Sequence, residues 1–147
     1  IQAETPFYGV YYGQAALPME PDTLTWLENE TLRQCAVYDY GTGKTGAIYD
    51  TARLTESRDP YDVFLSGARA LLTVENPNAK TDRELIVFRD SFGSSLVPLL
   101  LGDYARVTLV DIRYVSSAKL DSFLDFHGQD VLLLYSTLVL NSSSSLK

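Results

Sequence analysis

The sequence predicts an α/β fold in which helices flank a parallel sheet. Two observations indicate this class. From residue 84 onward, short apolar runs alternate with amphipathic stretches, and each apolar run is continuous rather than alternating with polar residues. Strands that are buried on both faces of a parallel sheet have this pattern. Residues 1 to about 60 instead combine many turn-forming residues with brief β-prone pieces, so we expect a loop- and hairpin-rich segment before the core.

The expected strands follow from these runs in chain order. Ala36–Tyr40 and Ala47–Tyr49 flank a glycine-rich turn and predict a hairpin, although the loop length leaves its register open. The turn pair Tyr12–Gly13 belongs to the same turn-rich segment. Three parallel strands are expected in the core, at Glu84–Phe88, Val107–Asp111 and Asp130–Tyr135.

Two helices are expected between those strands, because parallel neighbours need crossover connections. Ser94–Leu101 predicts a short helix, with core-facing residues at Leu96, Leu99 and Leu100. A second helix is expected to begin at Ser116 or Ser117 and to end near Gly128, with a buried face formed by Leu120, Phe123 and Leu124.

Length and charge limit the organisation and the partners of the chain. The 147 residues are enough for one core, so we expect a single α/β domain or the C-terminal part of a larger one. Its parts would be a β-rich extension at 1–60, a strand-helix core at 61–140 and a flexible tail at 141–147. A net charge of −7 argues against nucleic acid as a partner. No apolar run approaches the roughly 20 residues that a membrane-spanning helix needs.

The chain begins at Ile1 and shows no basic, apolar leader, so we expect either a fragment of a longer protein or a product that has lost a targeting segment. Cys35 is the only cysteine and His127 the only histidine, which excludes intrachain disulfides and Cys/His zinc sites. Because the acidic residues also lack the spacing of a metal loop, we expect neither a metal nor a cofactor.

A serine follows the first expected parallel strand, in the segment Arg89–Gly93. Sites in such sheets lie beyond the carboxyl ends of the strands. Gly93 permits a sharp turn there, and Ser91 would be exposed at a helix N-terminus, where backbone N–H groups can stabilise an oxyanion. The alternative is that Asp90 and Ser91 only cap the helix.

A series of short motifs between Thr5 and about Tyr135 resembles the C-terminal region of DHHW-family proteins. In order they are Phe7-Tyr8-Gly9, Leu17-Pro18, Pro21-Asp22-Thr23, Tyr61-Asp62-Val63-Phe64-Leu65-Ser66-Gly67, Asp90-Ser91-Phe92, Val97-Pro98 and Val110-Asp111-Ile112-Arg113-Tyr114. That family is similar to SGNH hydrolases and to O-acetyltransferase-like proteins of polysaccharide modification. The resemblance implies an SGNH- or flavodoxin-like half-domain, with Ser91 as the nucleophile.

The family's Asp-His run, which would supply the general base, normally lies upstream and is absent from this chain. The single Trp26 follows Thr25 rather than His. Two further positions depart from the SGNH pattern. Arg89 stands where a glycine usually precedes the Asp-Ser pair, and Ala68 follows Gly67 where an oxyanion-hole asparagine is expected.

Other residues allow two interpretations each. Asp111 and Arg113 follow the second parallel strand, so they could orient a substrate or a catalytic histidine, or could form a structural ion pair. His127 could be a base, or a solvated side chain at a helix end. The candidates for orienting groups or oxyanion donors are therefore Asp111 and Arg113, together with Asp90, Gly93 and Gly67.

Two functions are compatible with these residues. The first is a serine esterase or acyltransferase that acts on ester-decorated carbohydrate, or on an acylated small molecule, outside the cytoplasm or at the cell surface. The substrate and the location are implied by the resemblance alone. Such a protein would need the N-terminal remainder of the parent polypeptide, so this chain by itself would be inactive. The second is a non-catalytic surface or binding module that keeps the SGNH-like fold.

Overall fold

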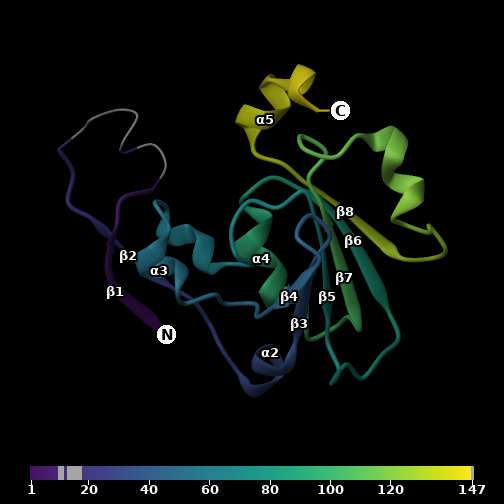
Figure 1. The fold of residues 1–147 in the computed structure, drawn as a ribbon, viewed down its shortest axis with the longest axis horizontal. Helices are drawn as coiled ribbons and strands as arrows, with labels where there is room; N and C mark the ends of the chain where they lie inside the picture. The colour runs from purple at the N-terminus through teal and green to yellow at the C-terminus, as the bar shows by residue number, and fades with distance from the viewer. Residues whose placement is uncertain (10–11, 13–17, 147) are drawn as a thin grey trace.

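The structure is a computed structural model that describes residues 1–9, 12 and 18–146. Figure 1 shows a small two-stranded ribbon beside a larger sheet with short helices around it. The strands are β1 (Gln2–Phe7), β2 (Asp22–Thr25), β3 (Ala36–Asp39), β4 (Lys44–Gly46), β5 (Leu71–Glu75), β6 (Glu84–Arg89), β7 (Arg106–Val110) and β8 (Asp130–Leu134). The helices are α2 (Glu30–Gln34), α3 (Arg53–Glu56), α4 (Gly93–Leu100) and α5 (Thr137–Asn141), with 3₁₀ turns η1 (Pro60–Val63), η2 (Ser117–Ser122) and η3 (Ser143–Ser145). The turn expected at Tyr12–Gly13 and the family landmark Leu17 include positions outside the described residues.

The large sheet has the strand order β4-β3-β5-β7-β6-β8. The three strands expected in the core are present within one residue of their expected ends, and β7, β6 and β8 run parallel to one another. The α/β class is therefore confirmed. The sheet as a whole is mixed rather than parallel, because β5 pairs with β7 in the antiparallel direction and β3 and β4 continue that pattern.

The strand β5 had no counterpart among the expected elements, although it lies inside the sheet. Four of its five residues are buried, and Leu71 is paired with Val110 at the carboxyl end of β7. A short apolar run before residue 84 becomes a strand here because two neighbours, β3 and β7, satisfy its backbone hydrogen bonds on both sides.

The hairpin near residue 40 is confirmed, with a different second strand. β3 pairs with Lys44–Gly46, so the expected partner at Ala47–Tyr49 lies beyond the hairpin. Gly43 adopts φ +67° in the turn, and its N–H donates to the Asp39 carbonyl at 2.8 Å. Tyr49 instead forms an isolated antiparallel bridge with Phe64. The glycine sets a short turn, and the short turn fixes the register.

Helix α4 covers one face of the sheet, but with a different side from the one expected. Val97 and Leu101 have no exposed surface and Pro98 is buried, whereas Leu99 is 55% exposed. Packing on the strands selects the side of the helix that fits the sheet, and the apolar residues here occur nearly all round the helix. Of the expected face, Leu100 does pack against the main core and Leu96 is half-buried, so the expectation is wrong for Leu99 and incomplete because it left out Val97 and Leu101.

The second expected helix is also shorter than the sequence suggested. It is the 3₁₀ helix η2, and Ser116 makes no side-chain cap. Leu120 is buried in the cluster with Ile86 on the other face of the sheet, while Phe123 is 46% exposed. The connection must run the length of the sheet, from the end of β7 to the start of β8. A 3₁₀ helix rises about 2.0 Å per residue against about 1.5 Å for an α-helix, so it covers that distance with fewer residues.

The small ribbon β1–β2 is attached to the sheet through a third apolar cluster. Leu24 and Trp26 pack there against Val63 and Phe64, which lie in and after η1. Tyr49 contacts both this cluster and the main core. Within the described residues, no helix combines the length and the apolar character that crossing a bilayer requires.

Candidate functional site

Ser91 lies in the turn between β6 and α4. The strand ends at Arg89 and the helix begins at Gly93, so only three residues connect them. Ser91 is exposed, and it lines a cavity of about 630 Å³. The other walls come from the end of β1, from Tyr61 in η1, from Arg113 after β7 and from the β8–α5 junction at Ser136. The serine therefore opens into a cavity at the carboxyl end of the parallel strands.

Asp90 holds this turn in place. Its side chain is buried, and its residue is 2% exposed. Oδ1 accepts the Phe92 N–H at 3.0 Å, and Oδ2 accepts the Ser136 N–H at 2.7 Å. Its own N–H donates to the Leu134 carbonyl at 3.3 Å. Both carboxylate oxygens are thus used to join the turn to the end of β8 and the start of α5.

Ser91 does not cap the helix with its side chain. The N-cap position of α4 is Phe92, and no side chain makes a capping hydrogen bond there. Among the described residues, neither the Ser91 hydroxyl nor its N–H has a hydrogen-bond partner. The next three N–H groups are occupied, because Phe92 and Gly93 donate to Asp90 and Ser94 donates to the Ser91 carbonyl. The hydroxyl is available for chemistry, and the Ser91 N–H is the free backbone donor beside it.

Tyr61 is a residue of this site to which sequence reasoning assigned no role. Its hydroxyl donates to the Ser95 Oγ at 2.7 Å and reaches the Ser91 carbonyl at 3.2 Å. Burial raises the pKa of the Tyr61 phenol, so it remains a neutral donor. The sequence signal that could have indicated this role is that Tyr61 begins the run Tyr61–Gly67, which resembles DHHW-family proteins. The ring forms a wall of the cavity and connects η1 to the serine turn.

Arg89 lies buried beneath the turn with no exposed surface. Its Nη1 donates to the Asp90 carbonyl and its Nη2 to the Arg69 carbonyl, each at 3.3 Å, while Nε has no partner in the described part of the chain. Burial lowers the pKa of the guanidinium. Gly93 makes room for it, because a Cβ at that position would lie 2.7 Å from the Arg89 Cβ. The buried arginine is thus accommodated by the glycine four residues later.

Asp111 and Arg113 lie at the same end of the sheet as Ser91, as predicted. Phe88 pairs with Val110, so the residues that follow β6 and β7 are neighbours. Asp111 is fully buried and accepts the Arg113 Nε at 2.9 Å, Nη2 at 2.6 Å and backbone N–H at 3.1 Å. These bonds raise the pKa of Arg113. Asp111 therefore orients the Arg113 side chain, which lines the cavity with Ser91.

Gly67 and Ala68 lie outside the lining of this cavity. Gly67 has φ +91° and ends three successive residues with positive φ, which begin at Leu65. The carboxylate of Asp62 occupies the space that a side chain at Gly67 would need. Ala68 is exposed and has no side-chain amide that could donate to an oxyanion. In this loop, glycine is required by the backbone and by the close approach of Asp62.

His127 lies at the opposite end of the parallel strands. It precedes β8, whose first residue Asp130 pairs with Leu85 near the start of β6. Its Nδ1 is 3.0 Å from the Asp125 carbonyl, and its side chain is 61% exposed. A strand of five residues spans roughly 16 Å, so the histidine is far from Ser91. This placement agrees with the solvated alternative.

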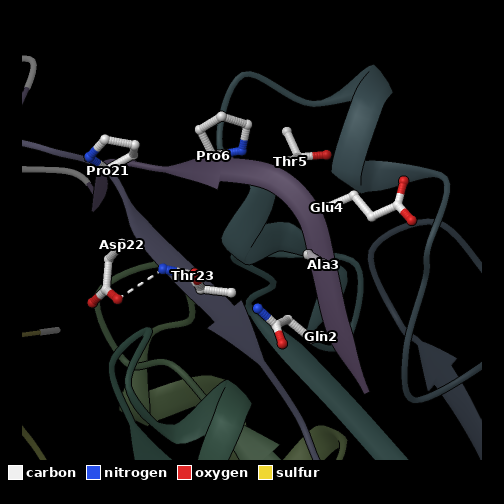
Figure 2. Close-up of a pocket in the computed structure, with 8 residues that line it drawn as sticks. All are labelled: Gln2, Ala3, Glu4, Thr5, Pro6, Pro21, Asp22 and Thr23. Carbon is white, nitrogen blue, oxygen red and sulfur yellow. Dashed lines mark hydrogen bonds between the residues drawn. The ribbon is translucent and has the colours of Figure 1, made fainter.

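Another depression lies between β1 and β2, and Figure 2 shows its lining. The Asp22 carboxylate accepts the backbone N–H of Thr23 at 2.7 Å, and the Glu4 carboxylate lies apart from Asp22. No serine, cysteine or histidine lines it. Within the described residues, no three His, Cys, Asp or Glu side chains converge as metal ligands would. The serine cavity is therefore the better candidate.

Fold and site together define an α/β protein with a serine in the turn that follows a parallel strand inside the sheet. Among solved structures, the chain is similar to a DHHW family protein from Eubacterium siraeum, with a TM-score of 0.65 and 23% identity over 95% of this chain and 48% of that one. PatB1 from Bacillus cereus, solved with a sulfonyl adduct, matches with a TM-score of 0.64 and 17% identity, over 95% and 47% of the two chains.

A further PatB1 structure gives a TM-score of 0.60 and 20% identity over 82% of this chain. No protein-family model matches the sequence, and neither does any curated protein. The chain thus has the fold seen in the DHHW family protein and in PatB1, and the expected resemblance is confirmed at the level of fold. It spans about half the length of the structures that it matches.

Proposed function

We propose that Ser91 is the nucleophile of a serine esterase or O-acyltransferase, of which this chain is one part. The observation that carries the proposal is the free Ser91 hydroxyl, exposed in a cavity of about 630 Å³ next to its own unpaired N–H and to Arg113. Ester-decorated carbohydrate as the substrate, and a location outside the cytoplasm, come from the DHHW resemblance.

The proposed reaction is acyl transfer through a covalent intermediate. The Ser91 Oγ attacks the acyl carbon and its proton passes to a base, while the alcohol leaves with a proton. Water or a sugar hydroxyl then takes the acyl group and releases Ser91. The Ser91 N–H is positioned at the attacking residue, where an oxyanion hole needs a donor. Because its Nε and Nη2 are held by Asp111, Arg113 can offer Nη1 to the substrate.

The base is the part that this chain does not supply. His127 is the only histidine, and it lies at the other end of the sheet. Asp90 is poorly placed to substitute, since it is buried beneath the turn and both its oxygens already accept backbone N–H groups. We propose that the N-terminal remainder of the parent protein provides an Asp-His pair, as the resemblance implies. The isolated chain should then be inactive.

A second candidate is a non-catalytic binding module with the same fold. It is favoured by the absence of a side-chain amide at Ala68 and by the occupation of three of the four backbone N–H groups from Ser91 to Ser94. The preceding sequence of the parent protein discriminates between the two, because an Asp-His-His-Trp run supports the enzyme and its absence supports the module.

Covalent labelling of the parent protein tests the proposal directly. A sulfonyl fluoride or phosphonate probe should modify Ser91, and the Ser91→Ala variant should lose the modification and all turnover while keeping its fold. Ser142→Ala is the matched control, because Ser142 is exposed and lines the same cavity. It should be labelled like the wild type. Modification at another residue, or none at all, would favour the binding module.

Turnover by the isolated chain tests where the base lies. We expect no Ser91-dependent hydrolysis of p-nitrophenyl acetate or of an acetylated sugar by these 147 residues, because a serine hydroxyl without a base is a weak nucleophile. The parent protein, assayed beside it, should hydrolyse at least one of them. Serine-dependent turnover by the isolated chain would place the base within it, and His127→Ala would then be the next variant.

A further inference from the structure

The strand β8 has one unpaired edge. It is the last strand of the sheet, and among the described residues it pairs only with β6. The Leu134 carbonyl faces β6, because it accepts the N–H of Asp90. Backbone groups of alternate residues point to opposite sides of a strand. Val131 and Leu133 therefore direct their N–H and C=O groups toward the open edge.

The side chains of β8 are those of an interior strand. Val131 is 56% exposed and Leu133 is 70% exposed, while Leu132 and Leu134 pack against the main core on the other face. Edge strands are normally protected by charges, prolines or short length. The run from Val131 to Leu134 contains no charged residue and no proline. It is apolar on both faces of the sheet, which is the pattern of a strand covered on both faces.

The other edge of the same sheet makes the contrast clear. It is formed by β4, a strand of only three residues with the sequence Lys44-Thr45-Gly46, and all three are exposed. A short, polar strand with a lysine is a protected edge. One edge of the sheet is thus built to face solvent, and the other is not.

The structures that this chain matches are about twice as long as the part of them that aligns with it. They align with 95% of this chain, yet this accounts for only 48% and 47% of their own lengths. The fold therefore accommodates about as much chain again. We propose that the free edge of β8, with Val131 and Leu133, binds a β-strand from the other half of the parent polypeptide and extends the sheet.

A parallel strand at this position would continue the direction of β7, β6 and β8. Its carboxyl end would then lie at the end of the sheet that carries Ser91. This consequence rests on the proposed function, because it matters only if Ser91 needs a base from elsewhere. The pairing itself does not depend on any activity.

Residue-resolved hydrogen exchange on the wild-type parent protein tests the pairing. The Val131 and Leu133 amides face open solvent in this chain, so without a partner they should exchange quickly. With a strand bound, we expect their exchange to slow at least 100-fold relative to unpaired amides, to the level of the Leu132 amide, which faces β6. Rapid exchange at both residues in the parent protein would overturn the proposal.

A pair of lysine substitutions in the parent protein gives a second test. Leu133→Lys should lower its unfolding temperature by about 3 °C or more, because apolar cross-strand contacts with the bound strand would be replaced by a charge. Leu27→Lys is the control, since Leu27 is 71% exposed against 70% for Leu133. It should shift the unfolding temperature by less than about 2 °C. Equal shifts would overturn the proposal.

A second copy of the chain is the other occupant that could pair with β8. Size measurement of the parent protein across a dilution series decides this. Slow exchange at Val131 and Leu133 that persists in the monomer supports the intramolecular strand. Loss of that protection as a dimer dissociates would overturn it. Since none of these measurements reads activity, an unreactive Ser91 would leave the result unchanged.

Discussion

Both ends of the parallel strands carry clusters of charged side chains, one buried and the other exposed. At the carboxyl end, Arg89 and Asp111 are fully buried, and the side chain of Arg113 is only 23% exposed. At the amino end, Arg106 bridges Glu75 and Glu84 on the surface, with nearly half of its side chain exposed. The same residue types therefore occur at both ends in different surroundings.

The two clusters differ in whether water can replace a charged partner that is lost. Exposed ion pairs contribute about 0 to 1 kcal/mol, because water and salt screen them and can replace either partner. A buried charge has no such replacement, so its partner fixes its position. The carboxyl end thus holds Arg113 and the serine turn in a defined geometry, while the charged side chains of the amino end and His127 face solvent. Four substitutions test this comparison.

The largest effect is expected for Asp111→Ala. It removes the carboxylate that binds Arg113 and that is the main opposing charge near buried Arg89. We expect a loss of about 3 to 5 kcal/mol in the free energy of unfolding, measured by urea denaturation of this chain. Glu75→Ala, at the amino end, should cost less than about 1 kcal/mol. Similar losses for the two variants would contradict the comparison.

Arg113→Ala should have the next largest effect. Asp111 would lose two side-chain donors and keep only the backbone N–H of residue 113, so a buried carboxylate would be incompletely paired. We expect a cost of about 2 to 3 kcal/mol in the same denaturation experiment. The matched variant Arg106→Ala should cost no more than about 1 kcal/mol. An Arg113 variant as stable as the Arg106 variant would show that Asp111 is not held tightly.

Gly93→Ala should have an intermediate effect, through packing rather than charge. The new Cβ would lie 2.7 Å from the Arg89 Cβ and 3.0 Å from its Cγ, so the buried arginine or the turn must shift. We expect a loss of about 1 to 2 kcal/mol. Gly102→Ala, near the other end of α4, meets nothing within 4 Å and should be neutral or slightly stabilising. Equal stability of the two variants would mean that the Arg89 packing is loose.

His127→Ala should have the smallest effect. Its side chain is 61% exposed, and within the described residues the polar interactions of its ring are with Asp125 and Gln129. The free energy of unfolding should change by less than about 0.5 kcal/mol, and probe labelling of Ser91 in the parent protein should be unchanged. A loss of labelling in this variant would connect the two ends of the sheet and contradict their separation.

Much of the fold could be predicted because its signals are local. The apolar runs of β6, β7 and β8 and the glycine-rich hairpin turn are readable in the sequence, and strand polarity places the residues after β6 and β7 at one end. The sequence alone was therefore enough to place Ser91, Asp111 and Arg113 together. Whether Ser91 acts as a nucleophile stays a prediction, because reactivity depends on a base that this chain does not contain beside it.

The sequence by itself thus determined the α/β class, the order of the three parallel strands along the chain and the position of the serine at a strand end. Only the tertiary structure decided that the sheet is mixed, that Asp90 joins β8 to the serine turn, and that Arg89 lies buried beneath Gly93. These features depend on contacts between segments that are distant in the sequence, or on the space left after those segments pack. Periodicity reports which face of a segment is apolar, but not which neighbour will cover it.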